Sequence, residues 1–272
     1  MQHCIAIALS ASALAIALPL SSARAVNPPD KSLEAVLREE LREPLKELTD
    51  EHYARIYNLT AVNKGIKDLT GLEKCKNLLA LRLSKNQITD AKPLAALTNL
   101  QTLDLADNKI ADVKPLAELK GLQYLELSNN AVSDVKPLAG LTRLNALYLG
   151  GNKISDVAPL AGLDRLWSLH LAKNQIKDIS ALGKLKWVST LDLNDNQIEN
   201  VAPLANLTEM NLVMIERNKI ADLKPLVAAA EKDAAGPMRF APFLRLYLDG
   251  NPLDGQAAQK AALQKAGVRL LK

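Results

Sequence analysis

Leucine returns at fixed positions every twenty-two residues along most of this 272-residue chain. In one copy of the pattern the apolar positions are Leu97, Leu100, Leu103 and Leu105, and Asn108 follows them. Adding twenty-two to each number gives the same residue types again. A period of this length predicts a solenoid, in which each repeat is one coil and neighbouring coils bury a continuous core. The asparagine recurs in seven successive coils, as Asn86, Asn108, Asn130, Asn152, Asn174, Asn196 and Asn218.

Each coil is expected to contain one short strand. In Leu103-Asp104-Leu105 apolar and polar residues alternate, so both leucines face the core and Asp104 faces the opposite side. The asparagine then leaves the strand into a turn, where its amide can bond backbone groups of neighbouring coils. Asp112 and Pro115 favour a tight 3₁₀ segment on the convex side over a full α-helix. Strands at the same position of every coil predict one parallel sheet with a step of about 4.8 Å.

This frame, LxxLxLxxNxIxD followed by xxPL, covers about residues 53–253. It resembles the leucine-rich repeats of bacterial internalin-type proteins, the class with twenty-two residues per repeat. The resemblance implies an α/β solenoid, a curved right-handed coil with a parallel sheet on its concave face and helical caps at both ends. It also implies a protein whose role is to bind a partner.

The N-terminal end departs from the repeat and predicts a cap. Residues 26–52 carry apolar positions at helical spacing. Asp30 is the expected N-cap of a first helix, and Pro44 is expected to end or kink it. Thr49 is expected to precede a second, short helix. We therefore expect residues 26–52 to cover the exposed apolar edge of the first coil.

The C-terminal end is also atypical. Regular repeats occupy residues 53–226, but Asn251 follows Asn218 by thirty-three residues instead of twenty-two. Residues 227–253 are therefore predicted to form an atypical last repeat with an inserted helix, because the insertion is rich in alanine, glutamate and lysine. Residues 254–272 are predicted to form a C-terminal capping helix.

The first twenty-five residues, 1–25, predict a secretory signal peptide. The stretch from Ile5 to Leu20 is apolar, and Ala23-Arg24-Ala25 after it matches an A-x-A cleavage site. Cleavage before Val26 would leave an exported chain, periplasmic or secreted. A stretch of sixteen residues is too short to span a bilayer, which needs about 20, so we expect no membrane span after signal removal. The four residues before Ile5 contain no Lys or Arg, which leaves an uncleaved apolar anchor open as the alternative.

Charge, cysteine and histidine content exclude several function classes. The formal net charge of +4 comes from 34 Lys and Arg against 30 Asp and Glu distributed throughout, which predicts a solvated surface and no nucleic-acid partner. Cys75 falls at a core leucine position and is expected to be a buried thiol without a disulfide. His52 and His170 lie in different parts of the fold, so we expect no metal site. No phosphate-binding or dinucleotide motif indicates a cofactor.

The residues that vary from coil to coil lie on the concave side of the strands. Aromatic, charged and methionine side chains stand there on an invariant frame, which is how a solenoid presents a binding surface. Small residues beside them predict an open trough. We expect a protein or peptide to lie along it, centred on coils three to seven, and the alternative is a solvated face that binds nothing specific. The predicted contacts are Arg82, Asp104, Tyr124, Glu126, Tyr148, His170, Asp192, Met214 and Tyr247.

A serine, histidine and acid set can be drawn on the same face from Ser168, His170 and Asp192. We expect no catalysis from it. Residues two apart on a strand are about 6.6 Å apart along the backbone, too far for an easy hydrogen bond between nucleophile and base. No glycine-rich elbow nearby predicts an oxyanion hole. The expected arrangement is a surface pair of His170 and Asp192 on a non-catalytic protein.

An intracellular role is the alternative to export. The same repeat type resembles regulatory subunits that hold a Ser/Thr phosphatase on their concave face. That role requires a retained N-terminus, against which Ala23-Arg24-Ala25 argues. The preferred prediction is an exported, monomeric and non-catalytic leucine-rich repeat protein, whose partner the repeat frame does not identify.

Overall fold

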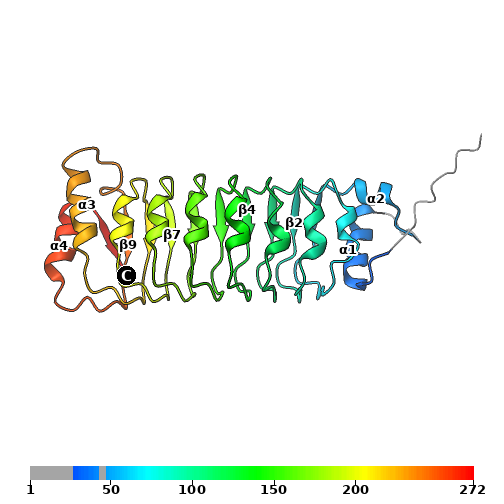
Figure 1. Cartoon of the computed structure of the whole chain (residues 1–272), viewed down its shortest axis with the longest axis horizontal. Helices are drawn as coiled ribbons and strands as arrows, with labels where there is room; N and C mark the ends of the chain where they lie inside the picture. The colour runs from blue at the N-terminus through cyan, green and yellow to red at the C-terminus, as the bar shows by residue number, and fades with distance from the viewer. Residues whose placement is uncertain (1–26, 43–46) are drawn as a thin grey trace, which may run out of the picture.

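The computed structural model describes residues 27–42 and 47–272. The predicted signal peptide and Pro44 lie outside these residues. The described chain is an elongated solenoid in which strands and 3₁₀ helices alternate, with α-helices at both ends (Figure 1). This is the α/β solenoid that the leucine period predicts.

All strands of the solenoid belong to one parallel sheet, and they follow one another in sequence order. Each strand has three residues, and the central one is buried in β1 to β9 and partly buried in β10. Leu103 pairs with Leu125 in the next coil, while Thr102 and Asp104 on either side of Leu103 are half-buried on the opposite face. The strands are β1 (Asn58–Thr60), β2 (Ala80–Arg82), β3 (Thr102–Asp104), β4 (Tyr124–Glu126), β5 (Ala146–Tyr148), β6 (Ser168–His170), β7 (Thr190–Asp192), β8 (Leu212–Met214), β9 (Arg245–Tyr247) and β10 (Arg269–Leu271).

The convex side consists of 3₁₀ helices, as the Asp and Pro positions predict. The Asp112 carboxylate accepts the backbone N–H of Lys114 at 2.9 Å, which starts the helix containing Pro115. Asn200 replaces this aspartate in the sixth coil, and its side-chain oxygen accepts from Ala202 in the same way. The 3₁₀ helices are η1 (Leu72–Lys74), η2 (Lys92–Ala96), η3 (Lys114–Leu116), η4 (Lys136–Gly140), η5 (Ala158–Gly162), η6 (Ser180–Lys184) and η7 (Ala202–Asn206).

The recurring asparagine forms a ladder between coils, as predicted. The Asn152 amide nitrogen donates to the carbonyl oxygens of Leu127 and Leu149, each at 3.0 Å, and its side-chain oxygen accepts the N–H of Val132 at 2.9 Å. One side chain thus satisfies buried backbone groups that the turn leaves unpaired. Asn251 continues the ladder after the longer last repeat, since it accepts from Ile220.

Two helices cover the N-terminal end of the sheet. Helix α1 (Lys31–Leu41) is capped by Asp30, whose carboxylate accepts the N–H groups of Ser32 and Leu33. This confirms the predicted N-cap. The same carboxylate accepts from Lys67 at 2.8 Å, which ties the helix to the first coil. Helix α2 (Asp50–Ala54) starts after Thr49, as expected.

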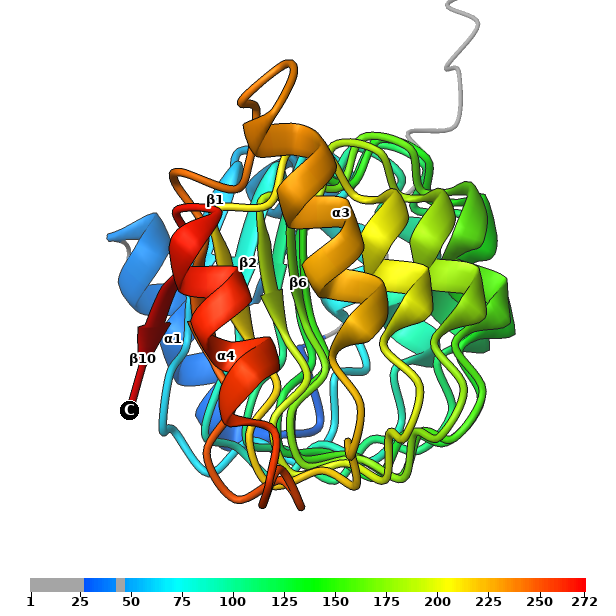
Figure 2. The same ribbon diagram turned by 90° about the vertical axis from the view of Figure 1, so that its left-hand side faces the viewer.

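The C-terminal end is more than the capping helix that the sequence predicts. Helix α3 (Lys224–Ala234) begins three residues before the predicted insertion, and α4 (Ala257–Lys265) lies beside it (Figure 2). After α4 the chain returns to the sheet as β10, whose Leu270 pairs with Leu246 of β9. The expectation of a helix alone over residues 254–272 was therefore incomplete, because the last segment also completes a strand.

The core runs the length of the solenoid between the sheet and the 3₁₀ helices. Cys75 is fully buried in it as a free thiol, as expected, and burial raises its pKa to about 12. Residues 27–42 and 47–272 contain no helix of the length and apolarity needed to cross a membrane.

Candidate binding face

The nine predicted contact residues lie on the face of the sheet turned away from the core, which we call the concave face. Tyr124 opens β4, and the other eight close successive strands. Pairing of neighbouring strands places these eight side by side in one row, in the order Arg82, Asp104, Glu126, Tyr148, His170, Asp192, Met214 and Tyr247. All are half-buried except Arg82, which is exposed.

Three ring side chains form a continuous run across the middle of the concave face. The ring centroids of Tyr124 and Tyr148 are 5.3 Å apart, with the planes tilted by 40°. Tyr148 stacks on His170 with centroids 4.5 Å apart and an angle of 26°. Such ring pairs are worth about 0.5–1.5 kcal/mol beyond the area they bury, so the three side chains stabilise one another on this face.

Ser168 and His170 are closer than the strand spacing suggested. His170 Nε2 lies 3.2 Å from Ser168 Oγ, within hydrogen-bond distance. The expectation that these groups are too far apart was wrong, because it used the backbone separation. The two side chains leave the same face of the strand, and the length of the imidazole covers the remaining distance.

The rest of this set does not complete a hydrolytic site. His170 Nδ1 and Asp192 Oδ2 are 3.8 Å apart, an ion-pair distance that is too long for a hydrogen bond. Ser168 is only 7% exposed, so a substrate has little access to its hydroxyl. The backbone N–H of Leu171 donates to the Asp192 carbonyl at 2.7 Å. The sheet thus uses this donor, which an oxyanion would otherwise need.

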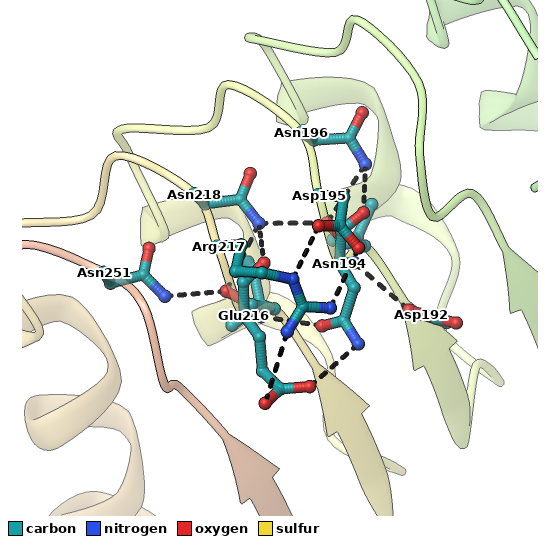
Figure 3. A network of polar contacts seen from close by, with 10 residues as sticks. Asp192, Asn194, Asp195, Asn196, Glu216, Arg217, Asn218 and Asn251 are labelled. Carbon is teal, nitrogen blue, oxygen red and sulfur yellow. Dashed lines mark hydrogen bonds and ion pairs between the residues drawn. The ribbon is translucent and has the colours of Figure 1, made fainter. Parts of the chain in front are cut away.

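A polar network fixes the edge of the concave face beside Asp192 (Figure 3). The Asn194 side chain donates to Glu216 at 3.0 Å and accepts the backbone N–H of Glu216 at 2.7 Å. The Arg217 guanidinium holds Asp195 through two hydrogen bonds of 2.6 and 2.9 Å. Glu216 therefore sits at a defined position next to the predicted contacts.

The concave face is acidic between β3 and β8. Asp104, Glu126, Asp192 and Glu216 project there, and the outward strand positions from Thr102 to Met214 hold no Lys or Arg. At the β2 end, Arg82, Thr102, Asp104 and Tyr124 line a hollow of about 370 Å³. Burial raises the pKa of Tyr124 to about 12, and the neighbouring Glu126 adds to the shift.

Comparison with known proteins shows which family the chain belongs to. The family model for "Leucine Rich repeats (2 copies)" matches residues 76–118 and 165–206, and a "Leucine rich repeat" model matches residues 98–154. The crystal structure of internalin C2 from Listeria monocytogenes is 34% identical in sequence. The match covers 74% of this chain and 89% of that one, with a TM-score of 0.69. The chain belongs to the internalin-like leucine-rich repeat family.

Other solved structures agree with this assignment. A second Listeria monocytogenes internalin (inlF) is 29% identical to this internalin-like protein, with 90% of this chain and 76% of that one covered and a TM-score of 0.70. A leucine-rich repeat protein of Leptospira interrogans shares the fold at 19% identity, with coverage of 76% and 57% and a TM-score of 0.58. No curated protein sequence matches the chain. Internalin-like proteins typically bind other proteins and are generally non-catalytic.

Glu126 gives the internalin-like protein a pH-dependent stability. Burial raises the pKa of its carboxyl; hydrogen bonds from Ser128 oppose the shift, while Asp104 adds to it. The folded state therefore keeps this proton to higher pH than the unfolded state does. Stability is lost as the pH rises from the ordinary pKa of 4.5 through the raised value. We expect Glu126→Gln, which can still accept the Ser128 N–H, to raise the Tm at pH 7 and to have no effect near pH 4.

The Tm of each protein measured across this pH range checks the prediction. Glu199→Gln is the matched control, because Glu199 is an exposed carboxylate in the turn after β7, outside the concave face. A Tm at pH 7 that rises equally in both variants, or that falls in Glu126→Gln, would contradict the account.

Sequence reasoning missed two features of this site. Glu216 lies twenty-two residues after Asn194, so it occupies the same position in the next coil and the repeat period identifies it. The repeat pattern cannot predict the contact of Ser168 with His170, because that contact depends on the side-chain rotamers of the two residues.

Proposed function

We propose that this protein is an exported, non-catalytic binding protein whose concave face holds a protein or peptide partner. The run of Tyr124, Tyr148 and His170 is the observation that carries the proposal. Equivalent positions in other coils hold Thr102, Asp104 and residues of other sizes, so the fold does not require rings there. Aromatic side chains at the centre of a surface are typical hot spots for binding.

The charge of the face favours a basic partner. The carboxylates of Asp104, Glu126 and Asp192 flank the rings. Tyrosine faces attract a guanidinium or ammonium group, and carboxylates beside them strengthen that attraction. We therefore expect the partner to present Arg or Lys side chains above Tyr124 and Tyr148.

Hot-spot variants test the placement of the partner. Tyr148 can be replaced by a photo-cross-linking phenylalanine analogue, and the cross-linked partner from the protein's own cell can be identified by mass spectrometry. We then expect Tyr124→Ala, Tyr148→Ala and Met214→Ala each to weaken binding by more than about 1 kcal/mol, roughly fivefold in Kd. Calorimetry measures this.

The matched control is Tyr57→Ala, which removes a tyrosine that is exposed outside the concave face. Unchanged affinity in all three concave variants would refute the placement. Equal weakening by Tyr57→Ala would show that the loss is not specific to this face.

Export is tested by the N-terminus of the chain recovered from its own cell. The apolar stretch before Ala23-Arg24-Ala25 supports cleavage, so we expect the recovered chain to begin at Val26. A cytoplasmic chain that retains Met1 would contradict export and would favour the intracellular regulator in its place.

A further inference from the structure

The most exposed large apolar side chains of the described residues all lie along one edge of the solenoid. This edge consists of the segments through which the chain enters each strand from the convex side. The core is complete without these side chains, so the fold does not explain them. They are Tyr57, Leu79, Trp167, Trp187, Met238 and Phe243, each between 39% and 63% exposed.

The same edge is basic. We define it as residues 55–57, 76–79, 98–101, 120–123, 142–145, 164–167, 186–189, 208–211 and 235–244, and call it the entry edge. It carries seven Lys and Arg against two carboxylates, Asp164 and Glu209. The ion pair of Glu209 with Arg239 neutralises one charge of each sign, which leaves six cations against Asp164. The cations therefore dominate this edge, although charge is nearly balanced over the whole chain.

The opposite edge, where the chain leaves each strand, differs in both respects. In its seven regular turns, residues 85–90, 107–112, 129–134, 151–156, 173–178, 195–200 and 217–222, there are seven Lys and Arg against nine carboxylates. None of the exposed large apolar side chains of the described residues lies there. Of these two edges, only the entry edge combines an excess of cations with exposed large apolar side chains.

The two tryptophans form the centre of the entry edge. They come from neighbouring coils, since the Trp167 carbonyl accepts the N–H of Ser189, two residues after Trp187. Arg143 and Arg165 occupy the positions that correspond to Trp187 in the two preceding coils. Beside Trp187 a hollow of about 300 Å³ is lined by Lys186, Trp187, Asn206, Thr208, Glu209 and Arg239.

The longer last repeat adds a projecting loop to this edge. The loop between α3 and β9 extends past the neighbouring loops in Figures 1 and 2. It exposes Met238 and Phe243, and the buried carboxylate of Asp233 holds its backbone by accepting the N–H groups of Phe240 and Ala241 at 3.1 and 2.9 Å. The insertion therefore presents apolar side chains on a fixed support.

We propose that the entry edge binds peripherally to an anionic lipid surface. Indole and phenyl side chains partition into the interfacial zone of a bilayer, and Arg and Lys beside them attract anionic headgroups. The coils from β1 to β9 align these groups over roughly 40 Å at about 4.8 Å per step. Because Tyr57, Leu79 and Trp167 hold the same position in their coils, their side chains lie along one edge and can contact a plane together.

An acidic protein is the other class of partner with suitable charge. The spread of apolar groups from Tyr57 to Phe243 favours the lipid surface, because a protein hot spot gathers its anchors at one centre. The lipid proposal is also independent of the concave face, which lies on a different side of the coil and stays open when the edge is in contact.

Tryptophan fluorescence provides a direct test, because Trp167 and Trp187 are the two tryptophans of the chain. The protein is used with the N-terminus that it has when recovered from its own cell. It is mixed with anionic vesicles of phosphatidylglycerol and phosphatidylcholine, or with neutral vesicles of phosphatidylcholine alone. We expect the emission to shift to the blue, and brominated lipids to quench it, with the anionic vesicles. An unshifted emission together with absent quenching would overturn the proposal, and an acidic partner protein would then be the remaining reading.

Matched variants separate the entry edge from other sources of lipid binding, including residues 1–25. Each exposed cation near an anionic membrane contributes about a fivefold increase in partitioning. The triple variant Arg143→Gln, Arg165→Gln, Lys186→Gln is therefore expected to lower vesicle partitioning in sedimentation by roughly a hundredfold. The control triple Lys109→Gln, Lys153→Gln, Lys177→Gln removes the same charge from the exposed opposite edge and should change it less than fivefold.

The apolar contribution is tested by Trp167→Ser with Trp187→Ser, which should lower vesicle partitioning at least tenfold. Both side chains are exposed, so circular dichroism is expected to be that of the parent protein. Equal losses in the two charge triples, or full binding by the tryptophan variant, would overturn the proposal. In every case the binding of the concave-face partner should be unchanged.

Discussion

Replacing Asn152 by alanine is expected to lower the free energy of unfolding by about 3–5 kcal/mol. The side chain is 8% exposed and bonds two carbonyl groups and the N–H of Val132, which belong to two neighbouring coils. Alanine leaves the buried N–H of Val132 without a partner, which costs about 1–3 kcal/mol. The Leu127 and Leu149 carbonyls each lose one of two amide donors, at about 0.5–1.5 kcal/mol each, and keep Asn130 and Asn174. This loss of unfolding free energy should be several times larger than that caused by a typical surface substitution.

Urea unfolding followed by circular dichroism measures this loss as a lower midpoint. Asn145→Ala is the matched control, because Asn145 is an exposed asparagine in the same coil. Its free energy of unfolding should stay within about 0.5 kcal/mol of the parent value. Equal midpoints for the two variants would show that the ladder contributes little to stability.

Asp233→Ala should have the second largest effect, about 3 kcal/mol of lost stability. Asp233 is a 5% exposed carboxylate that accepts N–H groups from Arg239, Phe240 and Ala241 at 3.0, 3.1 and 2.9 Å. A carboxylate that accepts backbone bonds makes stronger hydrogen bonds than a neutral acceptor does. Its removal should release the loop of residues 235–244 before the rest of the solenoid unfolds.

Hydrogen exchange and thermal unfolding together measure this effect. We expect the backbone amides of Phe240 and Ala241 to exchange much faster in Asp233→Ala, while those of the strands stay protected. Glu231→Ala is the matched control, because Glu231 is an exposed carboxylate on the same helix. Slow exchange at Phe240 in the Asp233 variant would contradict the proposed role of this carboxylate.

The repeat determined the features that every coil needs. The alternation in Leu103-Asp104-Leu105 predicted a strand with one buried face, and the position of Asn108 predicted the ladder. Both depend on backbone register, which a period of twenty-two residues specifies. The predicted contact residues also fall on one face for this reason, because residues at equivalent positions of parallel coils must lie side by side.

Features outside the repeat were harder to predict. Strand β10 has only Arg269, Leu270 and Leu271, and Leu270 follows its partner Leu246 by twenty-four residues, so no periodic signal marks it. The stacking of Tyr148 on His170 depends on side-chain rotamers. The position of Trp167 on the entry edge follows from the frame, but its exposure depends on how the coils pack.

The insertion in the last repeat has a consequence for how such a solenoid can change. The chain gains eleven residues between Leu226 and Asn251, yet Asn251 bonds its neighbours as the regular asparagines do. An insertion that precedes strand β9 thus leaves the turn after that strand unchanged. Loops on the entry edge can therefore be lengthened or exchanged one at a time, in nature or by grafting, without re-engineering the sheet that carries the other surface.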